Sequence, residues 1–314
     1  MKKLFVGLSV FLFAVILAAC TPSSDTFDES KNITVYTRDT TSGTRVGFMD
    51  GIGFSEAAAN DSVLVEGFVI QDNTQIFTSM QTDLYGIGYV SLSTVTSQVK
   101  GLKYDGVAPT VANVINNTYG LKRPFNYMVR SEGDYSSETV EQLVEAFVAF
   151  LGTTDAADII NNNGAVALPA TATWDSIKAD YPVTAQDNSG VTVRFGGSDS
   201  IQKVAQALTS AFKPKAGNFI AEHDHTGSGD AYKRTNDPAI KDTAVGKDVG
   251  FASRPFSASE IAGTVESERG QLAWDAIVAI VHNDNPVSNI TGAELKNIYS
   301  GVFKTWAELL NAQN

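Results

Sequence analysis

Residues 191–212 read VTVRFGGSDSIQKVAQALTSAF, and this stretch decides the fold. Its first five residues are mostly β-branched and aromatic, which is typical of a strand. After the small polar residues 196–200, apolar side chains recur at the spacing of one helix face, at Ile201, Val204, Leu208 and Phe212. A strand, a short turn and a helix in immediate succession predict an α/β fold.

The same alternation continues through the chain, which has 314 residues, 43% of them apolar and 18% charged. This composition excludes a disordered or multi-span membrane protein, and the length is enough for two domains. Further helical patterns cover 140–151 and the segment after the Thr291/Glu294 capping box. The other predicted strands are 33–36, 86–92, 219–222 and 276–281, the last a continuous apolar run.

The charge balance is acidic, with 23 Lys and Arg against 35 Asp and Glu, a net charge of −12. Such a chain disfavours non-specific binding to nucleic acid or to anionic lipid. An anionic ligand would therefore have to be held by local donors.

The amino terminus predicts export. Lys2 and Lys3 precede an apolar run to residue 19 that is too short for a typical spanning helix, so residues 1–19 are expected to be a signal peptide. Residues 17–20, Leu-Ala-Ala-Cys, resemble the bacterial lipobox, which implies that Cys20, the only cysteine, is lipidated. The alternative is a plain signal peptide. We expect residues 20–31 to be a tether and the protein to be anchored to the outer face of the cell membrane.

Small polar turns follow several predicted strands and open helices. They contain Arg38 with Ser42-Gly43-Thr44, then Ser198-Asp199-Ser200, Ser228 and Ser253. A helix N-terminus leaves backbone N–H groups unpaired, so an oxyanion can dock there. The alternative is that these residues are ordinary helix caps.

Enzyme chemistry finds less support. His223-Asp224-His225 could suggest a metal pair, but no third ligand is evident, and a polar strand end is the simpler interpretation. Gly227-Ser228-Gly229 lacks the spacing of a nucleophile elbow. We therefore predict no catalytic residue, no metal and no cofactor.

At this point the motifs resemble one family, the phosphate-binding lipoproteins of ABC-type phosphate uptake. Arg38 with Ser42-Gly43-Thr44 is similar to the family's Arg-x-x-x-Ser-Gly-Thr motif. Other motifs that resemble the family are 87–92, Tyr119 with Arg123-Pro124, 147–168, 197–200, 227–229, 250–255, 285–291 and 299–301 with Trp306. The resemblance implies a two-lobed, type II periplasmic-binding-protein-like fold.

The motif order is rotated relative to most of that family, which implies a circular permutation. Residues 169–190 would join the old termini as a surface connection, as permutation requires termini that lie close together. One lobe would then be residues 32–123 plus 276–314, and the other residues 124–275.

The resemblance further implies that phosphate lies between the lobes. Arg38, Ser42, Gly43 and Thr44 would bind it from one side, and Ser198, Asp199, Ser200, Ser228 and Ser253 from the other. Some members carry a carboxylate at the position of Ser253 to accept the phosphate proton, a role left here to Ser253, Asp199 or Asp230. An ABC permease would be the partner of a monomer. The alternatives are a receptor for another tetrahedral oxyanion, a secreted phosphohydrolase with the same cradle, and an adhesin with a degenerate site.

Overall fold

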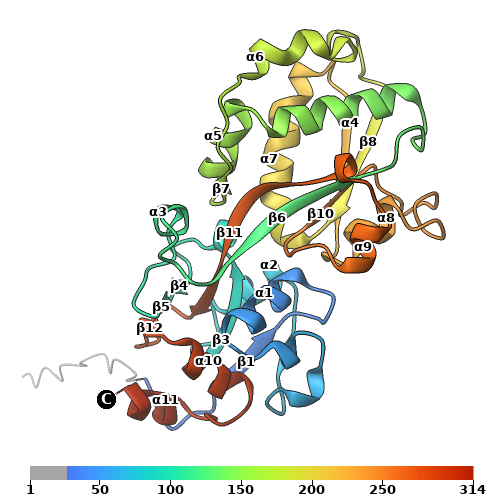
Figure 1. The fold of residues 1–314 in the computed structure, drawn as a ribbon. Helices are drawn as coiled ribbons and strands as arrows, with labels where there is room; N and C mark the ends of the chain where they lie inside the picture. Colours follow the sequence, from blue (N-terminus) through green and yellow to red (C-terminus); the bar gives the residue numbers. More distant parts are fainter. Residues whose placement is uncertain (1–26, 314) are drawn as a thin grey trace, which may run out of the picture.

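A computed structural model describes residues 27–313 and arranges them in two groups of elements, one above the other (Figure 1). The predicted signal peptide and Cys20 lie outside these residues. Within 27–313, no helix combines the length and apolarity needed to cross a bilayer.

A mixed sheet runs through both groups. Its order is β2-β1-β3-β11-β6-β10-β8-β9, and β4 and β7 pair with β11 off this path. The bounds are β1 Thr34–Thr37, β2 Val69–Ile70, β3 Gly86–Ser91, β4 Lys100–Gly101, β6 Lys122–Val129, β7 Val166–Ala167, β8 Thr192–Gly197, β9 Ile220–His225, β10 Val249–Ala252 and β11 Arg269–Val281. β5 (Lys103–Tyr104) and β12 (Asn289–Ile290) form a separate pair.

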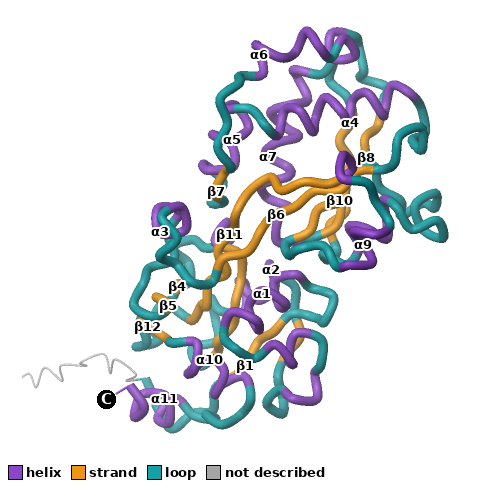
Figure 2. Tube along the Cα trace, in the orientation of Figure 1, coloured by secondary structure: helices purple, strands orange, loops and turns teal. Residues whose placement is uncertain are grey.

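The two groups are joined by β6 and β11, which pair antiparallel and pass from one group to the other (Figures 1 and 2). Because both connections are strands of one ladder, they form a two-stranded hinge rather than a flexible linker.

The lower group has its own core. Its helices are α1 (Gly43–Gly51), α2 (Asn73–Ser79), α3 (Val111–Ile115), α10 (Gly292–Tyr299) and α11 (Trp306–Gln313). Phe48 stacks on Tyr89 with ring centroids 3.9 Å apart, and Tyr299 meets the edge of Phe48. Trp306 is fully buried, and its indole N–H donates to the carbonyl of Tyr85.

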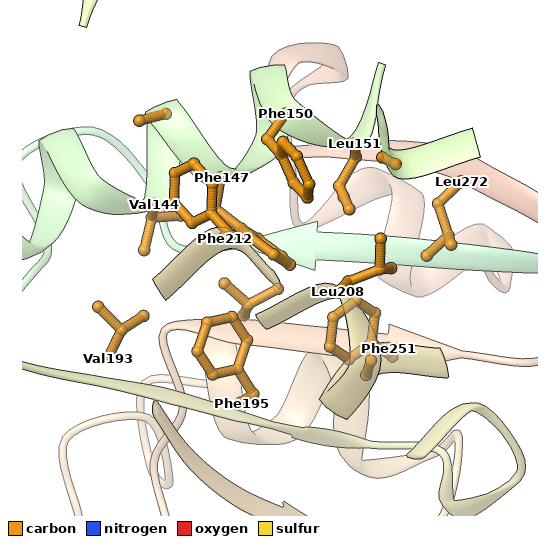
Figure 3. Close-up of a cluster of buried hydrophobic side chains, with 14 of the residues drawn as sticks. Val144, Phe147, Phe150, Leu151, Val193, Phe195, Leu208, Phe212, Phe251 and Leu272 are labelled. Carbon is orange, nitrogen blue, oxygen red and sulfur yellow. The ribbon is translucent and has the colours of Figure 1, made fainter. Parts of the chain in front are cut away.

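The upper group has a second core, formed by residues of 125–273 (Figure 3). Its helices are α4 (Glu138–Leu151), α5 (Thr154–Asn162), α6 (Trp174–Ile177), α7 (Gln202–Phe212), α8 (Asp230–Thr235) and α9 (Ala258–Ala262). Phe147, Phe212 and Phe195 meet between α4, α7 and β8. The helical face predicted over 201–212 is therefore core.

The α/β fold and each predicted strand and helix are present, but one strand is longer than predicted and several strands were not predicted. β11 begins at Arg269 rather than at residue 276, because its first half lies in the upper group and pairs with β6. β6, which contains Pro124, and its neighbour β10 were not predicted, and neither were the two-residue strands β2, β4, β5, β7 and β12.

Residues 169–190 are more structured than the predicted surface connection. They contain α6 and two short 3₁₀ turns, and Trp174 is 1% exposed. Its ring packs edge-on against Phe150 and Phe212. The segment therefore contributes to the upper core, although most of its other side chains are exposed.

The ends of the described chain lie side by side. Ile33 N–H donates to the carbonyl of Lys304 at 2.8 Å, and Trp306 N–H donates to that of Lys31. Phe27 packs against Trp306, so the folded part begins several residues before the predicted tether ends at residue 31.

Candidate anion-binding site

The predicted turns meet between the two cores because of the sheet topology. β8 runs parallel to both β9 and β10, so their carboxyl ends lie at one edge. β1 is parallel to β2 and β3 in the other group. The carboxyl ends of parallel strands are where α/β proteins bind ligands. Gly197, with φ of 95°, lets β8 turn sharply into Ser198, since a Cβ there would lie 2.2 Å from the Phe251 carbonyl.

Arg38, directly after β1, lies at the centre of this region and is fully buried. Its Nη2 donates to both carboxylate oxygens of Asp199, at 2.8 and 2.7 Å, and its Nη1 donates to Thr44 Oγ1 at 3.1 Å. Asp199 also accepts the N–H of Asn73, the first residue of α2. The pair therefore joins the upper group to the lower one.

One nitrogen of Arg38 has no partner. Its Nε is buried without a hydrogen bond, and an unmade hydrogen bond of a buried charged group is costly. The N–H at Nε of Arg38 is thus free to donate a hydrogen bond to a ligand. The backbone of Arg38 is fixed, because its N–H donates to the Tyr89 hydroxyl and its carbonyl accepts from Arg45.

The start of α1 supplies hydroxyls and backbone donors. Ser42 is the N-cap, and its Oγ accepts the N–H of Thr44. Thr44 Oγ1 lies 2.6 Å from Ser200 Oγ of the upper group, so the two share a hydrogen bond. The first N–H groups of a helix point along its axis and carry partial positive charge. This end of α1 therefore favours an anion.

Ser198, Ser228 and Ser253 form a cluster of buried hydroxyls in the upper group. Ser253 Oγ lies 2.9 Å from Ser198 Oγ and 3.0 Å from Ser228 Oγ. Ser228 Oγ also accepts the N–H of Ser253. Each hydroxyl can rotate, so the cluster can turn donors toward a ligand.

Gly43 brings the two groups into direct contact. A Cβ on Gly43 would lie 2.4 Å from Ser228 Oγ and 2.8 Å from Ser253 Oγ. Only glycine fits, and the site is closed around its own side chains. A cavity of about 400 Å³ lies away from these residues, beside α4. A ligand could enter only if the groups separate.

Two charged residues of this region, Arg123 and Asp275, were not predicted as site residues from the sequence. Arg123 of β6 donates from Nε and Nη2 to Asp275 of β11, and from Nη1 to Ser253 Oγ at 3.0 Å. Asp275 is fully buried and also accepts from Ser91. Burial raises the pKa of Asp275, and the Arg123 guanidinium opposes this. The Arg-Pro motif and the acid just before an apolar strand were the available signals.

The predicted phosphate-binding residues therefore all lie in the region between the two groups. Asp230, the other candidate acceptor of the phosphate proton, lies outside it. The Asp230 carboxylate accepts from Thr226 and pairs with Arg234. Of the two candidate carboxylates, only that of Asp199 contacts Arg38. Residues 27–313 contain no group of three His, Cys, Asp or Glu side chains that could hold a metal ion.

These features define a class of fold: two lobes joined by paired strands, as in the type II periplasmic-binding-protein fold, with a polar site between the lobes. A family model described as a PBP superfamily domain matches residues 182–314. A crystal structure of the phosphate-binding protein of a Streptococcus pneumoniae phosphate ABC transporter superposes with a TM-score of 0.62, at 23% identity. The match covers 89% of this chain and 100% of that one.

Curated relatives confirm the resemblance seen in the motifs. The phosphate-binding protein PstS 2 of Streptococcus pneumoniae is 27% identical over 98% of this chain and 99% of its own length. PstS 2 of Streptococcus agalactiae is 27% identical over 94% of this chain and 93% of its own length. The chain is thus similar, over nearly its whole length, to phosphate-binding proteins of bacteria.

Proposed function

We propose that this protein is an extracytoplasmic solute-binding protein that captures inorganic phosphate between its two lobes and delivers it to an ABC permease. One observation carries the proposal: a fully buried arginine, Arg38, meets hydroxyls from both lobes at the starts of helices. Buried guanidinium groups suit oxyanions because their planar fork matches two oxygens.

The site offers donors for each oxygen of a tetrahedral anion. Arg38 contributes its free Nε, and its Nη1 contacts the hydroxyls of Thr44 and Ser200. Ser42 adds a hydroxyl at the N-cap of α1, next to the N–H of Thr44. The cluster of Ser198, Ser228 and Ser253 offers further donors from the other lobe, and Gly43 lets the start of α1 approach them. Donors from both lobes make ligand binding and lobe closure one event.

Charge balance gives the site a means of selecting phosphate. Arg38 is paired with Asp199 and Arg123 with Asp275, so the existing charges cancel. An ion with no proton to share adds uncompensated charge beside Asp199. A protonated phosphate can instead donate a hydrogen bond to that carboxylate. We therefore assign proton recognition to Asp199 rather than to Asp230.

A thermal-shift and calorimetry panel with phosphate, sulfate, molybdate and arsenate tests the assignment. A bound ligand stabilises the folded state in proportion to the logarithm of its concentration over Kd. We expect phosphate and arsenate to raise the melting temperature and sulfate to have little effect. A strong response to sulfate or molybdate alone would instead indicate a receptor for another oxyanion.

We propose a receptor rather than an enzyme, in keeping with relatives that are named as binding proteins. The phosphohydrolase alternative predicts phosphate release from a phosphomonoester, with or without divalent metal. The adhesin alternative predicts no stabilisation by any oxyanion. Turnover in the first assay, or no response in the second, would contradict the receptor.

Membrane attachment through Cys20 completes the proposal. The chain would be held by lipid at Cys20 as a monomer, with residues 21–26 leading to the folded part. Cys20→Ser should remain as uncut precursor or leave the detergent phase, whereas wild type should partition into it. Equal partitioning of the two proteins would rule out this anchor.

We also propose that the chain is a circular permutant of the commoner family order. The pneumococcal relative aligns with it from end to end, so the two share one order of segments. The adjacent chain ends support the proposal, since residues 304–306 hydrogen-bond to residues 31–33. In the commoner order, that junction would be a continuous connection.

A further inference from the structure

His223 and His225, which play no part in the proposed phosphate cradle, line up in a hydrogen-bonded chain that ends at the anion turn. Both lie on β9 and share one face, because alternate residues of a strand point the same way. His223 stacks on Phe195 of β8, and His225 stacks on Phe251 of β10. Neighbouring aromatic rings therefore fix the orientation of both imidazoles.

The chain runs from α7 to the anion turn. Thr209 Oγ1 lies 2.9 Å from His223 Nε2, and His223 Nδ1 lies 3.0 Å from His225 Nε2. His225 Nδ1 lies 2.9 Å from the carbonyl oxygen of Ser198. Each imidazole nitrogen thus has one partner.

The Ser198 carbonyl fixes the position of every proton in the neutral chain. A carbonyl only accepts, so His225 carries its proton on Nδ1 and accepts at Nε2. His223 must then donate from Nδ1 and accept at Nε2, which leaves the Thr209 hydroxyl as donor. Both histidines are the Nδ1–H tautomer, which is a directly measurable state.

The last bond of the chain acts on the anion site through one peptide group. The Ser198 carbonyl and the N–H of Asp199 belong to the same peptide, and Asp199 is the first residue of a short 3₁₀ helix, Asp199–Ile201. A hydrogen bond to a carbonyl polarises the peptide and strengthens its N–H as a donor. Ser198 is also held by its N–H to Phe251 and by its hydroxyl to Ser253. The hydrogen bond from His225 therefore helps to hold the turn at Ser198–Ser200, whose donors face the proposed ligand.

The chain can also take up one proton without losing a bond. A proton arriving at His223 Nε2 would be donated to Thr209 Oγ1, whose own hydrogen can turn to the carbonyl of Gln206 at 3.2 Å. Transfer of the His223 Nδ1 proton to His225 Nε2 would then move the positive charge next to Ser198. A second proton would set two N–H groups against each other, so uptake stops at one. His223 lines a cavity of about 340 Å³ from which the proton can arrive.

The charged groups around the two histidines determine the pH at which the chain takes up this proton. Burial lowers the pKa of His223 and of His225 to about 4. Asp199 of the anion turn and Asp224 of β9 favour protonation of His225, whereas Lys247, before β10, opposes it. His223 faces His225 and, across the cavity, Lys213 at the end of α7. An anion bound at the Ser198 turn adds negative charge on the side of Asp199 and so favours uptake.

We propose that His225 is a positioning residue for the anion turn, and that the Thr209–His223–His225 relay takes up one proton when an anion binds. Anion affinity then increases as the pH falls, beyond the change caused by titration of the ligand. This inference rests on the proposed phosphate site.

Phosphate calorimetry at pH 7 and pH 5 on matched variants tests the relay. His225→Asn keeps an N–H donor near the position of Nδ1 but cannot take up the proton, and His225→Leu loses both. We expect His225→Leu to weaken phosphate binding about tenfold at both pH values. His225→Asn should stay within about twofold of wild type at pH 7 and fall at least threefold behind it at pH 5. Titration of phosphate itself cancels in these ratios.

Imidazole ¹⁵N NMR of the wild-type protein provides a second readout, because the chain has only three histidines. We expect both relay histidines as Nδ1–H tautomers, and a phosphate-induced increase of about 1.5 in the pKa of the pair. By linkage, such an increase from a pKa of about 4 corresponds to a gain in affinity of roughly threefold to fourfold at pH 5 and almost none at pH 7. His282, beyond the end of β11, is the internal control, and His282→Asn should bind phosphate as wild type does.

The outcomes separate the two proposals. An Nε2–H tautomer at His225, wild-type affinity of His225→Leu, or a histidine titration unmoved by phosphate would each overturn the relay while the phosphate site stood. Failure of wild type to bind phosphate would overturn the proposed function and the anion-linked part of the relay. The tautomers, measured without phosphate, would still report on the hydrogen-bonded chain.

Discussion

The guanidinium of Arg38 and the carboxylate of Asp199 meet across the two lobes, with Nη2 at 2.8 and 2.7 Å from the carboxylate oxygens. Arg38 follows the first strand of the lower lobe and is fully buried, while the Asp199 side chain is 13% exposed. Without a ligand, Arg38, the main cationic donor of the site, is thus paired with the carboxylate of Asp199. An entering anion must share Arg38 with Asp199 or displace it, so this pair links affinity, selectivity and closure.

Arg38→Ala should weaken phosphate binding by at least roughly tenfold to a hundredfold. A hydrogen bond to a charged group contributes about 1.5–3 kcal/mol, and stranding a buried anion costs more. The phosphate affinity of Arg38→Lys should lie between those of wild type and Arg38→Ala, because lysine keeps the positive charge but lacks the planar pair of donors of a guanidinium. Calorimetry gives the affinities, with Arg269→Ala, in the upper lobe, as the control. Unchanged affinity in Arg38→Ala would refute the site assignment.

Asp199→Asn should bind phosphate less well and reject sulfate less strictly, because the amide no longer provides a carboxylate for the phosphate proton. The measurement is the ratio of phosphate to sulfate affinity. Asp230→Asn is the matched control, since Asp230 pairs with Arg234 outside the site, and its ratio should equal that of wild type. If Asp199→Asn leaves the ratio unchanged, proton recognition belongs to Ser253 or to another residue.

Asp275→Asn should lower the free energy of unfolding by about 3 kcal/mol or more, because it leaves the buried Arg123 charge without its counter-ion. Denaturant unfolding measures the change. Asp175→Asn removes the acid of an exposed pair with Lys178 and should have no measurable effect. Equal stability of wild type and Asp275→Asn would mean that Arg123 is satisfied by Ser253 and water alone.

Stability without ligand should fall as the pH decreases from 6.5 toward 4, in part through the relay histidines. Their pKa in the folded state, about 4, lies below the reference value of 6.5. In this window the unfolded chain binds protons that the folded chain does not, so acid favours unfolding. Replacing both histidines with Asn should flatten the dependence of the unfolding free energy on pH. A slope identical to wild type would show that the histidines titrate normally.

A reordered chain tests the permutation. Starting at Asp180, running to Gln313 and continuing through a short linker to residues 27–179, it should fold and bind phosphate with nearly wild-type affinity. The reason is that residues 31–33 and 304–306 already pair, and residues 178–180 are exposed between the buried Trp174 and Val183. Circular dichroism and calorimetry measure the outcome. A chain opened inside α7 should not fold, and failure of both would count against permutation at this junction.

Several features of this protein could be read from the sequence alone. The helix over 202–212 and the capping box at Thr291 depend on neighbouring residues, so periodicity and capping chemistry were enough to predict them. The turns after the strands could be identified for the same reason, and the family motifs grouped them into one candidate site.

The tertiary structure decided what depends on partners far apart in the chain. β6 contains a proline, and it becomes a strand through its ladders with β11 on one side and β10 on the other. Asp199 and Asp230 were equal candidates in sequence, and they differ because one reaches Arg38 across the lobes while the other reaches Arg234 on its own helix. The histidines form a relay only because β8 and β9 run in parallel with His225 opposite Gly197. Helix caps and periodic faces depend on neighbouring residues, so the sequence is enough to predict them. The pairing of Arg38 with Asp199, some 160 residues away, forms only when the two lobes pack against each other.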